Sequence, residues 1–269
     1  MRLPLATRLG ARLVALSYLA ALVAVPVGLV LYRALAPGLA AFWASVTTPA
    51  AIAAFNLTVT LLAIVVPLNV VLGTVTALVL VRGGDFRGKT LLQALLDLPF
   101  AVSPVVIGVA LIALWGRGGW FGGIADAGFP VIFALPGMAL ATAFVTLPFT
   151  VREVEPVLRE VGDEQEQAAG TLGATGWQTF WRITLPSIKG ALTYGTLLTV
   201  ARALGEYGAV LLVSSNLPGV SQTLTLLVHA RYHDVANTYG AYTAATVLMG
   251  LSLATLVAGA LLNRPRRTR

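Results

Sequence analysis

Residues 83–90, GGDFRGKT, match the phosphate-binding pattern G-x-x-x-x-G-K-[ST] at every fixed position. In nucleotide-binding proteins a buried strand leads into this glycine-rich turn, and backbone N–H groups at the start of the next helix hold the phosphates. Here the β-branched run ALVLV precedes the turn, and the helix-like run LLQALL follows it. The local pattern therefore predicts ATP binding, and the surrounding elements decide whether that prediction holds.

Two further pairs of side chains have a spacing that could support chemistry. His229 and His233 are four residues apart and could ligate a metal ion, but no third ligand of a suitable type lies near them, so we expect no metal site. Arg202 and Glu206 are also four residues apart and can form an ion pair on one helix face. Their surroundings are apolar, and an unpaired charge there would be costly.

The composition indicates a membrane protein. Of the 269 residues, 57% are hydrophobic and only 11% are charged, whereas soluble domains carry roughly 25% charged residues. A soluble chain of this length could not cover so much apolar surface. The sequence contains no cysteine, which excludes disulfides and thiolate metal sites.

Six segments are long enough to cross the hydrocarbon core, which takes about 20 mostly apolar residues. The first is long for a signal peptide and no clear cleavage site follows it, so we expect it to be retained. Segment 34–55 is uncharged too, but its prolines and small polar residues favour an external loop with a short surface helix. The predicted spans are 13–32, 57–81, 98–116, 127–151, 190–213 and 235–263. The expected fold is an all-α polytopic membrane protein that forms one domain over residues 1–269.

The basic residues predict the orientation of these spans, because cytoplasmic loops carry the excess of Lys and Arg. Fourteen of the 18 basic residues lie at the two termini, in the loop after the second span and in the segment after the fourth. Only Arg33, Arg117 and Arg231 fall on the opposite side. Both termini are therefore predicted to be cytoplasmic. This topology accounts for the net charge of +7 without a nucleic-acid partner.

The predicted topology removes the support for an ATP site in residues 83–90. A phosphate-binding loop belongs to a soluble α/β domain, which also supplies a magnesium-binding acid. Here the apparent strand is the end of a 25-residue span, 57–81, and no soluble βαβ unit occurs elsewhere in the sequence. We therefore interpret GGDFRGKT as a basic cytoplasmic turn between two membrane helices.

Residues 152–189 form the long cytoplasmic segment and hold six of the 11 acidic residues. Asp163 can cap a helix that begins at Glu164, and Gly173 suits a break after it. Trp177, Phe180 and Trp181 give the next piece an apolar face, and Pro186 is expected to stop it before the fifth span. Either a soluble partner docks on this segment, or it lies as an amphipathic helix in the membrane interface.

Part of this segment, QAAGTLGATGWQTFWRITLP at 167–186, resembles the EAA motif of ABC-importer permeases, E-A-A-x3-G-x9-I-x-L-P. The departure is a glutamine where the family usually has glutamate, with an acid displaced by one position. The resemblance implies a short helix that docks into a cleft of an ATPase. The residues it assigns to docking are Glu166, Gln167, Ala168, Ala169 and Gly173.

The resemblance extends over most of the chain. The stretches LLQALLDLPFAVSPVVIG, FVTLPFTVREVEPVL and ARALGEYGAV are similar to the permease subunits of bacterial sulfate/thiosulfate importers, and closer to the CysW type than to the CysT type. Molybdate permeases share much of ARALGEYGA, so a molybdate or tungstate importer is the alternative. The resemblance implies a type I ABC-importer permease fold in the bacterial inner membrane. It also implies a second homologous permease, an ATPase dimer and an external sulfate-binding protein. ATP and Mg would bind the ATPase, and no cofactor would bind this chain.

The charges within the predicted spans allow two roles each. Arg202 could stabilise a divalent oxyanion in transit while Glu206 orients it, or the two could form a structural ion pair. We favour the pair, because a carboxylate beside an anion path is electrostatically unfavourable. Asp97 could lie at the cytoplasmic mouth of the path, but we expect it to cap the helix of the third span.

Two other classes of function fit the sequence less well. A membrane-embedded enzyme should show His, Asp or Cys clustered within its spans, and an ion channel would not explain a docking motif in the long cytoplasmic segment. The sequence therefore favours a transport subunit that catalyses no reaction itself.

Overall fold

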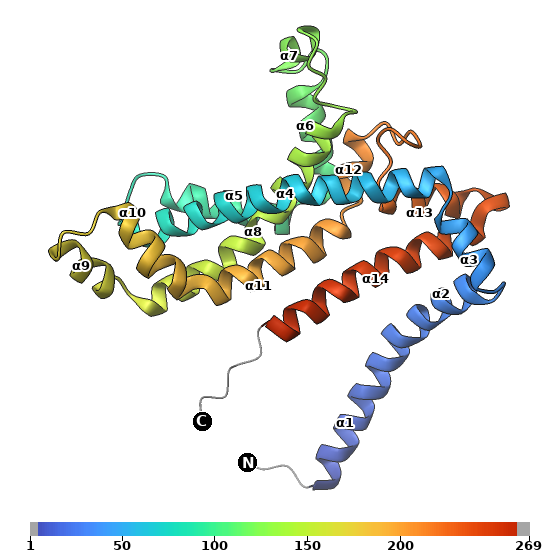
Figure 1. Cartoon of the computed structure of the whole chain (residues 1–269), viewed down its shortest axis with the longest axis horizontal. Helices are drawn as coiled ribbons and strands as arrows, with labels where there is room; N and C mark the ends of the chain where they lie inside the picture. The colour runs from blue at the N-terminus through green and yellow to red at the C-terminus, as the bar shows by residue number, and fades with distance from the viewer. Residues whose placement is uncertain (1–4, 263–269) are drawn as a thin grey trace.

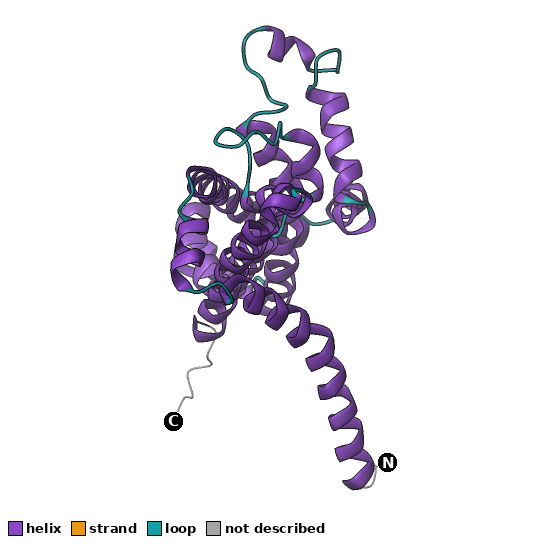
Figure 2. Ribbon diagram, turned by 90° about the vertical axis from the view of Figure 1, so that its right-hand side faces the viewer, coloured by secondary structure: helices purple, strands orange, loops and turns teal. Residues whose placement is uncertain are grey.

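The structure, a computed structural model, describes residues 5–262. These residues form helices joined by turns, and no strand occurs among them (Figures 1 and 2). In chain order the helices are α1 (Leu5–Leu19), the π-helical η1 (Ala20–Ala24), α2 (Val25–Leu35), α3 (Leu39–Val46), α4 (Pro49–Arg82), α5 (Lys89–Ala101), α6 (Pro104–Trp115), α7 (Gly122–Asp126), α8 (Leu135–Val161), α9 (Glu164–Thr171), α10 (Gly176–Thr179), the π-helical η2 (Phe180–Thr184), α11 (Leu185–Leu204), α12 (Gly208–Val213), α13 (Leu224–His233), the 3-10 helix η3 (Val235–Asn237) and α14 (Thr238–Leu262).

Helices α4, α8 and α11 form the centre of the molecule and lie side by side along its long axis (Figure 1). Small residues let them approach closely: a methyl group added at Gly73 of α4 would lie 2.7 Å from Thr150 Cβ of α8. The Asn69 amide of α4 donates to Thr146 Oγ1 of α8 at 2.7 Å. The Thr150 hydroxyl lies 3.1 Å from that of Thr199 on α11. Close packing and interhelical hydrogen bonds thus join the three helices. This is expected in a membrane, because the hydrophobic effect does not drive helices together in lipid.

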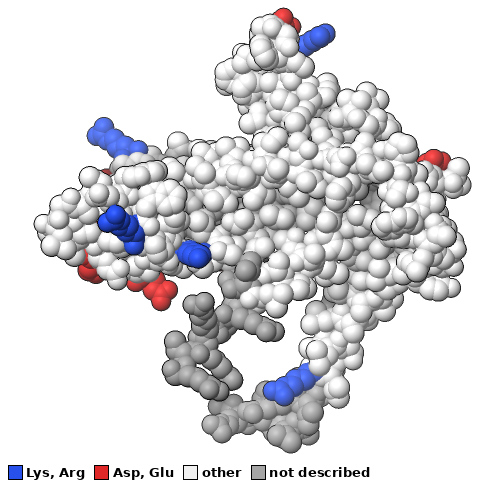
Figure 3. All heavy atoms as spheres, viewed as in Figure 1, with Lys and Arg blue, Asp and Glu red and all other residues white. Residues whose placement is uncertain are grey.

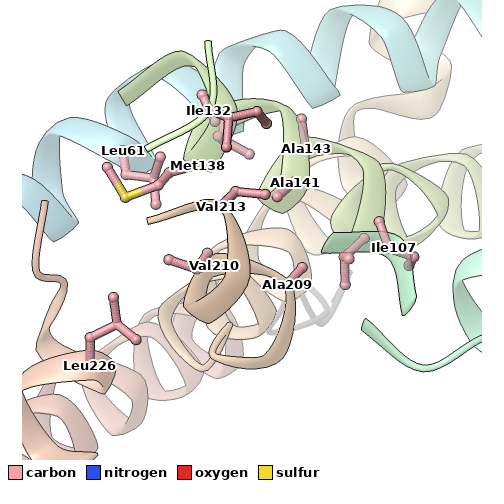
Figure 4. Packing of buried hydrophobic residues seen from close by; sticks show 13 residues of the cluster. Leu61, Ile107, Ile132, Met138, Ala141, Ala143, Ala209, Val210, Val213 and Leu226 are labelled. Carbon is pink, nitrogen blue, oxygen red and sulfur yellow. The ribbon is translucent and has the colours of Figure 1, made fainter. Parts of the chain in front are cut away.

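Two apolar clusters fill the space between these helices. One joins α4, α6, α8, α12 and α13; Figure 4 shows its members Leu61, Met138 and Val213 meeting from three of them. The other is built from residues of α4, α8 and α11 nearer to α9, among them Leu80 and Leu158. Each cluster combines residues far apart in the sequence, so the core depends on the whole chain rather than on one hairpin.

Two of the helices that enter the bundle are broken. The axes of α5 and α6 differ by 118° across Val102 and Ser103, and the Ser103 side chain caps α6 by accepting from Val105 N at 3.3 Å. Helix α11 ends before Gly205, and α12 resumes at Gly208. The two breaks meet, because a methyl group at Gly208 would lie 3.1 Å from Pro104 Cβ. Beyond its break, α6 leads into α7, and both project from the bundle as an arm (Figures 1 and 2).

These breaks correct several expectations. The third predicted span, 98–116, begins too late and is not one straight helix, since α5 starts at Lys89 and a sharp bend follows Ala101. Asp97 lies inside α5 and therefore does not cap a helix. The fifth predicted span, 190–213, is interrupted between Leu204 and Gly208.

The boundaries around the long segment predicted to be cytoplasmic, 152–189, also differ from the prediction. Helix α8 begins at Leu135 and continues to Val161, so it starts later than 127 and includes the first ten residues of segment 152–189. Pro186 does not stop a helix. It is the second residue of α11 and directly follows the π-helical turn η2, and α10, η2 and α11 follow one another without a break.

The surface is consistent with a bilayer environment. Four helical segments are long and apolar enough to cross a membrane, and the bent pair α5–α6 is a fifth candidate. The four are Gly10–Leu35, Pro49–Arg82, Leu135–Val161 and Val235–Leu261. On the face in Figure 3 the charged residues lie near the edges, and the broad middle is uncharged. The prediction of six spans adds α11, which has 20 residues but carries Lys189 and Arg202.

We predict that Gly73→Ala destabilises the protein, because its methyl group would overlap the Thr150 side chain where α4 packs against α8. Overpacking of this kind costs about 1–3 kcal/mol. The measurement is the thermal unfolding midpoint in detergent. Gly250→Ala in α14 is the control, since nothing lies within 4 Å of the added atom. Equal midpoints for the two variants would contradict this account of the packing.

Candidate functional site

The turn GGDFRGKT joins two helices and has no preceding strand. Helix α4 continues to Arg82, and α5 begins at Lys89. Gly84 and Gly88 adopt positive φ angles of 64° and 99°, which tighten the turn. The Lys89 ammonium folds back and donates to the Gly84 carbonyl at 2.9 Å. The side chain that would reach a phosphate in a nucleotide site thus binds its own turn, in agreement with the interpretation of this segment as a helix connection.

Helix α9 is the short helix expected from the EAA-like motif. It begins at Glu164 with Asp163 at the N-cap position, as predicted, although the Asp163 side chain makes no capping hydrogen bond. Gly162 (φ +70°) makes the turn from α8, and Gly173 (φ +85°) the turn that follows α9. The helix is attached at one end of the bundle, beyond the ends of α4 and α8 (Figure 1).

The residues assigned to docking divide between two faces of α9 and the turn after it. Gln167 and Ala168 are exposed, and Gly173 is exposed in the turn. Ala169 is half-buried. Leu172 is 88% exposed beside them. The exposed side of this segment is therefore a small, largely uncharged surface that includes an apolar side chain.

Glu166 faces inward, away from that surface. Its Oε2 accepts from Arg82 Nε of α4 at 2.9 Å, and its Oε1 accepts from the Thr184 hydroxyl of η2 at 2.7 Å. Glu166, the acid one position before the place where the family usually has glutamate, therefore lies against the membrane helices. Arg82 and Thr184 were missed in the sequence because both contacts are long-range and leave no local spacing signal.

The helix after the turn has a local signal that could have been recognised. Thr175 and Gln178 form a capping box: Gln178 N donates to Thr175 Oγ1 at 3.3 Å, and Thr175 N donates to Gln178 Oε1 at 2.9 Å. The T-x-x-Q spacing is the usual signature of this cap. It fixes the start of α10, after which Trp177 and Trp181 pack edge to face with ring centroids 5.5 Å apart.

Arg202 and Glu206 form the predicted ion pair, with Arg202 Nη1 2.7 Å from Glu206 Oε2. The carboxylate is almost fully buried at 1% exposure, whereas the Arg202 side chain is 31% exposed. Glu206 also accepts from Ala209 N at 2.9 Å through Oε1, and its carbonyl accepts from Thr225 Oγ1 at 3.0 Å. Glu206 therefore satisfies the backbone at the break between α11 and α12, in addition to neutralising Arg202.

Asp97 pairs with a residue from another helix. Asp97 Oδ1 of α5 accepts from Arg152 Nη2 of α8 at 2.6 Å, and both side chains are more than half exposed. The Arg152 guanidinium lies 4.0 Å from the centroid of the Phe100 ring, a cation–π distance. Arg152 is thus held over α5 by a carboxylate and an aromatic face while one side remains accessible.

The two histidines lie on α13 with ring centroids 4.4 Å apart, and His229 also contacts the Tyr207 ring at 5.2 Å. Within residues 5–262 no group of three or more His, Cys, Asp or Glu could hold a metal ion. On the same helix Arg231 is buried and donates to Thr48 Oγ1 at 2.7 Å. Burial lowers the pKa of Arg231 from its ordinary value.

Known proteins share this architecture. The family described as binding-protein-dependent transport system inner membrane component matches residues 69–268. A bacterial alginate ABC transporter, solved in complex with an alginate-pentasaccharide-bound periplasmic protein, superposes with a TM-score of 0.73. The alignment covers 97% of this chain and 94% of that one at 15% identity, and this likeness concerns the fold alone. The chain belongs to the family of binding-protein-dependent inner membrane transport components, and it is a multi-pass transport subunit of the permease type.

The relatives narrow the group further. The sulfate transport system permease protein CysW of Synechococcus elongatus is 47% identical over 251 residues, which cover 93% of this chain and 87% of the relative. The CysT protein of Synechocystis is 40% identical over 237 residues, covering 87% and 80%. Both names refer to sulfate, and the identity is higher to the CysW protein, as the sequence motifs indicated. Neither relative supports the molybdate alternative.

We predict that Glu206→Gln destabilises the protein more than Arg202→Met, because it removes the charge that neutralises Arg202 and weakens the cap of α12. Removal of one partner of a buried pair costs about 3–5 kcal/mol, and the lower end applies here because Arg202 is 31% exposed. The double variant should recover part of this loss. The measurement is the unfolding midpoint in lipid nanodiscs.

The control is Arg159→Met, which removes an exposed pair within α8 and should change stability by less than about 1 kcal/mol. Strictly additive losses in the double variant would mean that Arg202 and Glu206 do not depend on each other.

Proposed function

We propose that this chain is the membrane-spanning permease subunit of an ATP-driven sulfate importer. The observation that carries the proposal is the similarity to CysW over nearly the whole length of both chains. The chain itself catalyses no reaction. It provides half of a path for a divalent oxyanion and alternates between outward and inward openings as partner subunits hydrolyse ATP. Thiosulfate, a divalent tetrahedral anion like sulfate, is the second substrate of the proposal.

The proposed partners are those expected from the family, and the surfaces of the chain suggest where each would bind. An ATP-binding cassette dimer, which holds the ATP and Mg, docks on the exposed side of α9 around Gln167, Ala168 and Leu172. An external sulfate-binding protein delivers the anion at the opposite end, near α3 and α13. A second homologous permease completes the path. No cofactor binds this chain in the proposal.

The basic residues support the proposed orientation. Arg82, Arg87 and Lys89 lie on the same side as the long segment that contains α9, whereas Arg231 lies at the far end of α14. The excess of basic residues marks the α9 side as cytoplasmic. In this orientation α9 meets a cytoplasmic ATPase, and both termini are cytoplasmic.

The half-exposed charges indicate where the anion path runs. Arg152 and Asp97 lie on helices that contribute to the bundle, and an ionisable group within a span rarely faces lipid. Arg202 is also partly exposed, near the point where the α5–α6 and α11–α12 breaks meet. We infer that the path runs close to these arginines, where guanidinium groups would offset the charge of the oxyanion. Glu206 then orients Arg202 from its buried side.

We predict that the purified complex of this permease, its homologue and the ATPase takes up sulfate into proteoliposomes when a sulfate-loaded binding protein is present. Ala168→Trp should abolish this uptake, because a bulky side chain on the exposed side of α9 prevents seating in the ATPase cleft. The measurement is [35S]sulfate uptake together with binding-protein-stimulated ATP hydrolysis. Molybdate-loaded protein should not stimulate hydrolysis.

Asp85→Trp is the matched control, since Asp85 lies in another cytoplasmic turn and its side chain is fully exposed. Stimulation by molybdate alone would contradict the proposed substrate. Wild-type uptake by Ala168→Trp would contradict the proposed docking surface.

A further inference from the structure

Arg82, the last residue of α4, contacts α8, the turn that follows α8, and α9 at once. Its Nε donates to Glu166 Oε2 of α9 at 2.9 Å. Its Nη1 donates to the carbonyl of Leu158 in α8 at 3.1 Å, and its Nη2 donates to the carbonyl of Gly162 just after α8. Through Glu166 the network continues to the Thr184 hydroxyl of η2 at 2.7 Å. We call Arg82, Glu166 and Thr184, with these two carbonyls, the Arg82 clasp.

The clasp includes more hydrogen bonds than an ordinary surface ion pair and is less exposed to water. The last carbonyls of a helix have no partner within it, and Arg82 satisfies that of Leu158 in α8 together with that of Gly162, the residue after α8. A cation at this position also interacts favourably with the negative end of the helix dipole. The Arg82 and Glu166 side chains are only 21% and 20% exposed, so water screens their interaction weakly. The planar guanidinium, with several fixed donors, suits such a multiple contact.

Little else holds α9 to the membrane helices. No residue of α9 is buried. A hollow of about 430 Å³ separates it from α4 and η2, lined by Leu78, Gly170, Phe180 and the Glu166 and Thr184 side chains. Ala169 is only half-buried, so apolar packing of α9 against the bundle is limited. The side-chain connection across this hollow is Glu166, bound on one side to α4 and on the other to η2, which continues into α11.

We infer that the Arg82 clasp transmits the displacement of α9 to α4, α8 and α11, and that Arg82 and Thr184 are positioning residues for coupled transport. This inference rests on the proposed function, in which the ATPase moves α9. It also assigns the displaced acid of the motif: Glu166 binds inward, and the docking surface is the neutral one formed by Gln167, Ala168 and Leu172. If the clasp is opened, α9 stays docked and follows the ATPase while the membrane helices no longer respond.

The test compares Arg82→Met with Arg159→Met in the full complex in proteoliposomes. Both variants remove an arginine that pairs with a glutamate, but Arg159 pairs with Glu155 within α8 and joins no other element. The measurement is the number of sulfate ions taken up per ATP hydrolysed. We expect this ratio to fall about fivefold or more in Arg82→Met, the scale of a typical coupling between sites, and to stay at the wild-type value in Arg159→Met. ATPase should co-purify in wild-type amount with both.

Two milder variants keep the test decisive if Arg82→Met does not fold. Arg82→Lys keeps the charge but loses the multiple donors, and Thr184→Val removes a single hydroxyl; each should lower the ratio by a smaller factor. A wild-type ratio in all three clasp variants would overturn the inference. An equal fall in Arg159→Met, or loss of the ATPase on purification of Arg82→Met, would overturn it too, since the effect would then be general or due to docking.

A second readout separates this inference from the proposed function. Hydrogen exchange of the α9 amides in the permease needs neither sulfate nor the ATPase. Arg82→Met should speed that exchange about fivefold or more relative to Arg159→Met if the clasp holds α9. If the wild-type complex failed to transport sulfate while this difference appeared, the substrate would be wrong and the clasp would stand. Unchanged exchange would overturn the clasp whatever the substrate.

Discussion

A charge in or near hydrocarbon needs a partner, and in this chain the partners lie where helices end, bend or meet. Glu206 neutralises Arg202 at the break between α11 and α12. Asp97 and Arg152 join α5 to α8, and Arg82 joins α4 to the end of α8 and to α9. Because isolated charges are costly in this medium, each pair fixes the relative position of two elements. The ends, bends and crossings of the helices are thus the places where ion pairs hold the fold together.

Between these points the helices are joined by a different kind of contact. Gly73, Thr150 and Thr199 bring α4, α8 and α11 close together, and Asn69 spans two of them with its amide. Such contacts hold the bundle as one body but do not extend to α9, which has no buried residue. The molecule therefore combines a tightly packed body with the short helix α9, whose side-chain contacts to α4 and η2 are hydrogen bonds, an arrangement that suits the proposed docking of a partner.

Hydropathy was sufficient to place most of the apolar segments, because a span needs a continuous run of apolar residues whatever its neighbours are. It could not reveal the bend after Ala101 or the break at Gly205, because it does not read local signals such as Ser103-Pro104, where Ser103 caps α6 and Pro104 begins it. The wrong cap assigned to Asp97 has another reason: its partner Arg152 lies 55 positions away. The existence of the short helix α9 was predictable from fixed motif positions, but the inward orientation of Glu166 was not, because Arg82 and Thr184 give no local signal.

The contact between α6 and α12 also constrains how the protein is made. Pro104 meets Gly208, and Phe133 N donates to Val213 O at 2.7 Å, so the arm formed by α6 and α7 is anchored by residues translated about a hundred positions later. At about 5–20 residues per second, several seconds pass before α12 leaves the ribosome. During that interval the α5–α6 segment is already in the bilayer without its anchor. Final assembly of the outer half of the bundle is therefore a late step of biosynthesis, and a ribosome stalled before α12 would leave this segment open to membrane proteases.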